Sequence, residues 1–477
     1  MNRLSFYLLL LLSSYSVAQA APLEKHPIAV EALFSIYDLK LPLLAYHGFI
    51  QNFAQPTEER NDKNLKRILH TISKIHSIYP SLKYPENILQ FSAEKSRDPE
   101  EIEIITSIAA RKLSEQGTLA DIKKETEILH DNNQPSLFIH GQEFLVHGLY
   151  QKAIENHEKL LQESSLQKLE TKKDGLLLNL ARAHYNLKNY ESAQKYFQKV
   201  STESNLFPEA LLGLAWTYLI QGNTSKAVGT AYNLMTGNMK YTFHPEAPII
   251  VALALAEKCN YMEALTALRN FRKTYDPAYQ WLYHWKRNQG NKNQNLYSLL
   301  TSAEVPINIR YEWMHSPVFL ALQAEINELF IEKEKSATLL TQLGLGIPSN
   351  QIEIFNIISS LSEKIPEIQK AIVNRINEEL AFLNRRMLAQ WVDAFENSQS
   401  IQIELFESMG TDIIHRRRSL KSPIVQNNEV ISHDSNGLPT LEWGKITHTR
   451  LEDDLELWSD ENGFLMTNIQ NKCINTK

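Results

Sequence analysis

The sequence predicts an all-α protein whose central part is a solenoid of paired helices. One motif recurs at a fixed step, because Leu180-Ala181 returns as Leu214-Ala215 and Ala193 returns as Ala227, each 34 residues later. Between these small residues, apolar side chains lie three and four residues apart, which is the spacing of an amphipathic helix. A step of this length with two helices in each unit indicates a stacked repeat array.

Composition sets the class of protein but gives little information on its partner. The chain has 477 residues, of which 43% are hydrophobic and 22% are charged, so it has the composition of a folded globular protein. Its formal net charge is −6. A mildly acidic chain lacks the concentrated basic face that nucleic acid requires, and we expect no nucleic-acid partner.

Residues 1–20 predict a signal peptide. Arg3 supplies a positive start, Phe6 to Leu12 is an apolar run, and Ala18-Gln19-Ala20 fits a cleavage site before Ala21. The apolar run is too short to cross about 30 Å of hydrocarbon. We therefore expect an exported chain, most simply in the periplasm and alternatively secreted, with no membrane span after cleavage.

Residues 21–133 predict an N-terminal helical region. Its clearest element is an amphipathic helix from Leu65 to Ile78, where isoleucines and leucines recur at helical spacing and Pro80 follows. We assign no repeat to its first part, and residues 99–130 could hold a degenerate one.

Residues 134–275 predict about four tetratricopeptide (TPR) repeats. Each places small residues where its two helices touch and where the chain turns between them. The residues that carry the pattern are Gly141, Gly148 and Ala153 in the first repeat, Leu180, Ala181 and Ala193 in the second, Leu214, Ala215 and Ala227 in the third, and Ala252, Leu255 and Ala264 in the fourth.

Beyond the repeats, we expect a helical extension over 276–365 and then a long amphipathic helix over 366–418. An antiparallel pair that breaks near Asn397-Ser398 would fit the same periodicity. The helix could fold back along its own chain or form a homodimer through 366–414 as a coiled coil does. Residues 419–477 predict a loop-rich tail with acidic and aromatic segments.

The sequence leaves open whether its two cysteines, Cys259 and Cys473, form a disulfide. An exported protein could pair them, but two cysteines so far apart make no disulfide framework. We take two free thiols as the default expectation.

No reaction centre is visible in the sequence. The chain has no phosphate-binding loop, no nucleophile elbow and no CxxC pair, and His140 and His147 lack the spacing of a zinc-protease motif. We therefore expect no enzyme activity, no cofactor and no metal. An unrecognised active site within 280–420 is the least favoured alternative.

A protein-binding groove is the predicted functional site. In such an array the first helix of each repeat lines the concave face, and this face is apolar enough to indicate a ligand such as an amphipathic helix or an extended peptide. The chain's own terminal helices could also fill it. Trp216 is the most informative position because tryptophans anchor interfaces. The groove positions are Phe138, Leu145, Leu178, Arg182, Tyr185, Leu212, Trp216, Leu219, Ile220 and Leu253.

Three segments carry a closer resemblance. The helix Pro208 to Trp216, the loop Phe243 to Ala247, and the tail Leu455 to Glu461 with Cys473 resemble bacterial envelope tetratricopeptide proteins associated with gliding-motility machinery. The resemblance implies a periplasmic, non-enzymatic scaffold with protein partners of the envelope. A secreted virulence or adhesion factor of the same fold is the alternative.

Overall fold

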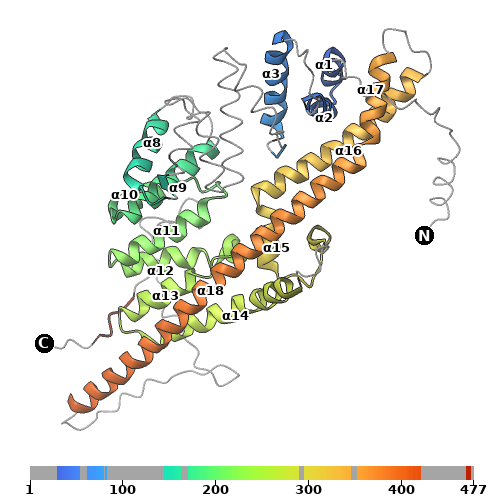
Figure 1. Cartoon of the computed structure of the whole chain (residues 1–477). Helices are drawn as coiled ribbons and strands as arrows, with labels where there is room; N and C mark the ends of the chain where they lie inside the picture. The colour runs from blue at the N-terminus through green and yellow to red at the C-terminus, as the bar shows by residue number, and fades with distance from the viewer. Residues whose placement is uncertain are drawn as a thin grey trace, which may run out of the picture. The chain divides into compact units, whose positions relative to one another are not determined.

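The computed structural model describes residues 30–53, 62–79, 81–82, 141, 144–145, 147–162, 170–288, 295–344, 352–419 and 469–473. The predicted signal peptide, much of the region 21–133 and most of the tail lie outside these ranges. Every regular element among the described residues is a helix, which confirms the all-α prediction (Figure 1). The chain forms two compact units, one from residues 1–109 and 321–375 and the other from 110–320 and 376–477.

The second unit contains a series of helical hairpins. Each helix packs against the next one along the chain, and α11 also contacts both α9 and α13, so alternate helices stack on one another (Figure 1). This neighbour-to-neighbour packing is typical of repeat arrays. The helices are α8 (Tyr150–Gln162), α9 (Glu170–Asn186), α10 (Tyr190–Phe197), α11 (Phe207–Ile220), α12 (Thr224–Asn233), α13 (Ala247–Ala256) and α14 (Tyr261–Asn288).

The same turn joins the two helices of each hairpin. Its central residue has a positive φ: 73° at Gly148, 60° at Lys188, 74° at Gly222 and 56° at Cys259. That residue donates its backbone N–H three residues back, and the next residue donates five residues back, as in Asn189 to His184 at 2.9 Å. This is the Schellman pattern that closes a helix C-terminus.

An alanine follows each of these turns at a fixed place. Ala153, Ala193, Ala227 and Ala264 each donate a backbone N–H to the residue just after the turn centre, and each is fully buried. A methyl group at this place lets the second helix lie close to the first. The recurring alanines of the sequence therefore mark helix contacts.

A fifth hairpin with this turn lies in the first unit, where we assigned no repeat. It joins α1 (Val30–Asp38) to α2 (Pro42–Phe53). Lys40 has a φ of 64°, Leu41 donates to Ile36, and Ala45 donates to Leu41 and is fully buried. The α1–α2 hairpin therefore repeats the geometry of the second unit.

The rest of the first unit contains α3 (Asp62–Ile78), most of α16 (Pro317–Gly344), α17 (Ile352–Glu363) and the start of α18 (Ile365–Ser419). α3 packs on α2, and α17 packs on both α1 and α2. One face of α16 carries buried acids. Glu332 accepts the backbone N–H groups of Leu43 and Leu44, at 2.7 and 2.9 Å, and so caps the start of α2.

The long C-terminal helix is continuous. α18 spans 55 residues without a break at Asn397-Ser398. Its part in the second unit buries an apolar stripe against its own chain, because Trp391 stacks on Tyr279 of α14 with ring centroids 3.8 Å apart. Trp313 of α15 (Ile307–His315) donates its indole N–H to Asn384 at 2.8 Å. These contacts lie within one chain, as the fold-back arrangement requires.

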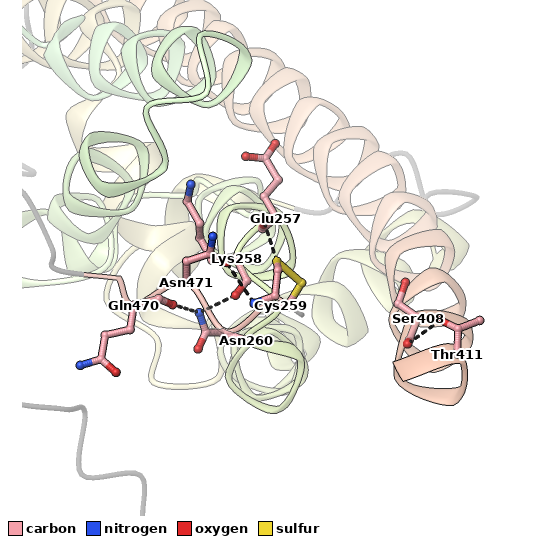
Figure 2. Close-up of a disulfide and its surroundings, with 9 residues drawn as sticks. Glu257, Lys258, Cys259, Asn260, Ser408, Thr411, Gln470 and Asn471 are labelled. Carbon is pink, nitrogen blue, oxygen red and sulfur yellow. Dashed lines mark hydrogen bonds between the residues drawn. A yellow bond between two sulfur atoms is a disulfide. The ribbon is translucent and has the colours of Figure 1, made fainter. Parts of the chain in front are cut away.

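The two cysteines form a disulfide, which corrects the expectation of free thiols. Cys259 lies in the α13–α14 turn and bonds to Cys473 across a separation of 214 residues. Hydrogen bonds reinforce the link, because the backbone N–H of Lys472 donates to the carbonyl of Lys258 at 2.9 Å. The side-chain amide of Asn260 also donates to the carbonyl of Gln470 at 2.8 Å (Figure 2). The late cysteine therefore fastens residues 470–473 to the fourth hairpin of the array.

Among the described residues, no helix combines the length and the apolar character that crossing a membrane requires.

Candidate functional site: the first-helix face

The candidate site lies on one face of α9, α11 and α13. We call this surface the first-helix face and define it by its partly or fully exposed residues. They are Arg182, Tyr185, Glu209, Leu212, Trp216, Ile220, Glu246 and Leu253. It includes most of the groove positions predicted from the sequence, together with two glutamates that the prediction omitted.

Six of the ten predicted groove positions are partly or fully exposed on the first-helix face. Arg182 and Ile220 are exposed, and Tyr185, Leu212, Trp216 and Leu253 are half-buried. These six side chains are available to a ligand, in whole or in part.

The remaining four predicted positions are buried, pack against the core or lie outside the described residues. Leu178 and Leu219 are only 2% and 6% exposed, so they belong to the core beneath the face. Leu145 is half-buried and packs against the cluster formed by Ile154, Leu180 and Ala183. Phe138 lies outside the described residues.

A repeated link connects the first helices to one another. Arg182 of α9 donates to the carboxylate of Glu209 at the start of α11, at 2.6 Å. At the equivalent position 34 residues later, Trp216 of α11 donates its indole N–H to Glu246 at the start of α13, at 2.7 Å. A carboxylate near a helix N-terminus is also stabilised by the helix dipole.

This link explains why the motif Pro-Glu-Ala occurs twice. It stands at 208–210 and again at 245–247, and in both places its glutamate receives the donor from the preceding first helix. The sequence contained this signal. Its role could not be read there, because the donors come from different residue types, one arginine and one tryptophan.

Tyr185 is the other aromatic residue of the first-helix face, and we call Tyr185, Trp216 and Glu246 together the corner. Its ring meets that of Tyr190 edge-on, with centroids 5.6 Å apart. Burial raises the pKa of the Tyr185 hydroxyl, and the neighbouring Tyr190 and the Glu246 carboxylate raise it further. The phenol therefore stays neutral at neutral pH.

The loop before α13 has a structural role. The loop Phe243 to Ala247 is one of the segments on which the resemblance to envelope proteins rests. Phe243 is 2% exposed and His244 is 8% exposed. The backbone N–H of Phe243 donates to Glu312 at 2.8 Å, and its ring packs edge-on against Tyr275. The loop belongs to the core, so it offers little surface to a partner.

No group of histidine, cysteine, aspartate or glutamate side chains in the described part of the chain is arranged to hold a metal ion. The first-helix face instead combines apolar surface, aromatic rings and carboxylates, which suits non-covalent recognition of a peptide.

Neither a known protein-family model nor a curated protein matches this sequence.

Proposed function

We propose that this chain is an exported, non-enzymatic scaffold of the tetratricopeptide type that binds protein partners in the bacterial envelope. The four hairpins with one turn geometry, the buried alanines after each turn and the neighbour-to-neighbour packing support the repeat assignment. The matching hairpin α1–α2 extends the same geometry to a second unit.

The disulfide supports the proposal of export. Structural disulfides persist in the periplasm or outside the cell and are rare in the cytosol. The link between Cys259 and Cys473 therefore agrees with the signal peptide expected at residues 1–20. Fractionation of a tagged chain tests the compartment, because recovery in the culture medium alone would favour the secreted alternative over the periplasm.

The observation that carries the binding function is the arrangement of Trp216. Its indole N–H is fixed by Glu246, yet the side chain is only half-buried. An aromatic ring held in one orientation loses little conformational entropy when a ligand packs on it. Large amphipathic side chains of this kind are frequent hot spots of interfaces.

Crosslinked capture from cell envelopes tests this function. We expect Trp216→Ala to reduce the yield of the captured partner by about tenfold or more, which corresponds to loss of a hot spot. Tyr283→Ala is the matched control, because Tyr283 is a 47% exposed aromatic residue on α14 that does not belong to the first-helix face. The same partners at the same yield from both variants would contradict the proposal.

A further inference from the structure

The charges of the first-helix face are not balanced. Arg182 is the cation of this face, and it is already paired with Glu209 at 2.6 Å. Glu246 receives a neutral indole N–H and forms no ion pair within the described ranges. Among the described residues, the half-exposed Glu246 carboxylate therefore has no cation paired with it.

Two aromatic rings accompany that carboxylate. The rings of Tyr185 and Trp216 are both half-buried and so present part of their surface. Aromatic faces attract cations through the ring quadrupole, with tryptophan the strongest, and a neighbouring carboxylate adds a direct charge. Two apolar side chains lie on the same helices, because Leu212 is about one turn before Trp216 on α11 and Leu253 is about two turns after Glu246 on α13.

We propose that the Tyr185–Trp216–Glu246 corner binds a lysine or arginine side chain of the partner, within a segment whose apolar residues lie along Leu212 and Leu253. This inference rests on the proposed function and specifies the partner's chemistry. Electrostatic complementarity of this kind sets the register and the specificity of a docked segment.

The same charges argue against one occupant from this chain, the acidic part of its tail. Residues 451–458 of the tail read LEDDLELW and carry four acidic residues. A segment with that charge would be repelled by Glu246, and like charges across an interface weaken binding. A basic partner segment satisfies the corner, whereas the chain's own acidic tail does not.

Two synthetic probes test the inference with the purified chain. They are amphipathic peptides with the same leucine and alanine positions, one with lysine and one with glutamate at every polar position, and fluorescence anisotropy measures their dissociation constants. We expect the lysine peptide to bind, the glutamate peptide to bind at least about tenfold more weakly, and added salt to weaken the lysine peptide.

A pair of charge-neutralising variants locates the effect. Glu246→Gln keeps an acceptor for the Trp216 indole and removes only the charge, and we expect it to weaken the lysine peptide about tenfold. Glu191→Gln on the exposed side of α10 makes the same change of net charge and should leave binding within about twofold. Equal loss in both variants, or no loss in Glu246→Gln, would overturn the inference.

The outcome also separates this inference from the proposed function. Envelope capture could depend on Trp216 and yet be unchanged by Glu246→Gln. In that case the face binds its partner without recognising a cationic side chain, and only the inference fails. If capture does not depend on Trp216, the proposed function itself fails.

Discussion

Single residues in the turns illustrate how backbone conformation shapes the array. Three of the five equivalent turn centres carry a side chain despite a positive φ, namely Lys40, Lys188 and Cys259. A residue with a Cβ is strained there, whereas glycine adopts the conformation freely. The hairpins form despite this strain. At Cys259 the turn position places the sulfur where it bonds to Cys473.

Lys188→Gly should stabilise the array. We expect the free energy of unfolding to rise by about 0.5–1 kcal/mol, because relief of the positive-φ strain exceeds the added entropy of the unfolded chain. Lys195→Gly within α10 is the control and should lower it by about 1 kcal/mol. Chemical denaturation measures both, and a destabilised Lys188→Gly variant would show that the lysine side chain itself contributes to folding.

A second residue-scale feature is the buried acid Glu332. Burial raises its pKa from the ordinary 4.5 to about 7, against the opposing effect of the two N–H groups it accepts from α2. A carboxyl whose pKa is higher in the folded state than in the unfolded chain favours folding when protonated. Its stabilising contribution is complete below pH 4.5 and is lost as the pH rises through 7.

The first unit should therefore lose stability between pH 6 and pH 8. Glu332 accounts for about 1 kcal/mol of that loss, because the unfolded state binds fewer protons at this carboxyl than the folded state does. His47, whose pKa burial lowers from 6.5 to about 4, acts in the opposite direction as the pH rises from 4 through 6.5. The comparison is therefore between wild type and Glu332→Gln. Denaturation at both pH values should show a smaller pH dependence in the variant, and identical slopes would exclude this role.

At the scale of elements, much of the second unit was predictable from the period. The recurrence of Ala193 as Ala227 predicted where the hairpins lie. The structure shows the physical reason, because these buried methyl groups lie where two helices touch. The α1–α2 hairpin was missed because no neighbouring copy stands 34 residues away and Pro42 reads as a break. In the structure Pro42 begins α2, a place that proline tolerates well.

The disulfide was not predictable, because spacing along the chain says nothing about a contact made by the tail. It closes a loop of 214 residues. Cys473→Ser should lower the free energy of unfolding by about 2–5 kcal/mol, mainly because the unfolded chain loses a constraint. Thermal unfolding with and without reductant checks this, and reductant should have no effect on the variant. An equal response of both proteins would show that the cysteines are not paired.

The packing of α18 on its own chain gives a further prediction. Trp391 is 4% exposed and stacks on Tyr279 and Phe395. Trp391→Ala should cost about 3–5 kcal/mol in stability. Phe382→Ala on the same helix, where the side chain is 53% exposed, should cost less than about 0.5 kcal/mol. The reverse order would indicate that the outer face of α18 is the one that packs, as a dimer would require.

At the scale of the whole molecule, the candidate site could be predicted in outline. The groove positions came from repeat register, and register places residues on a helix face without deciding how deep each one lies. Leu178 and Leu219 therefore proved to be core, while Glu209 and Glu246 were omitted because their role depends on donors from another hairpin.

Photocrosslinking from the first-helix face tests the central claim most directly. A photoreactive amino acid replaces Leu212 on this face in one variant and Glu191 on α10 in another, and both are illuminated in intact cells. We predict a discrete crosslinked partner from position 212 and none from position 191. Crosslinks of equal yield from both positions, or none from position 212 in a folded and exported chain, would contradict a scaffold that binds through this face.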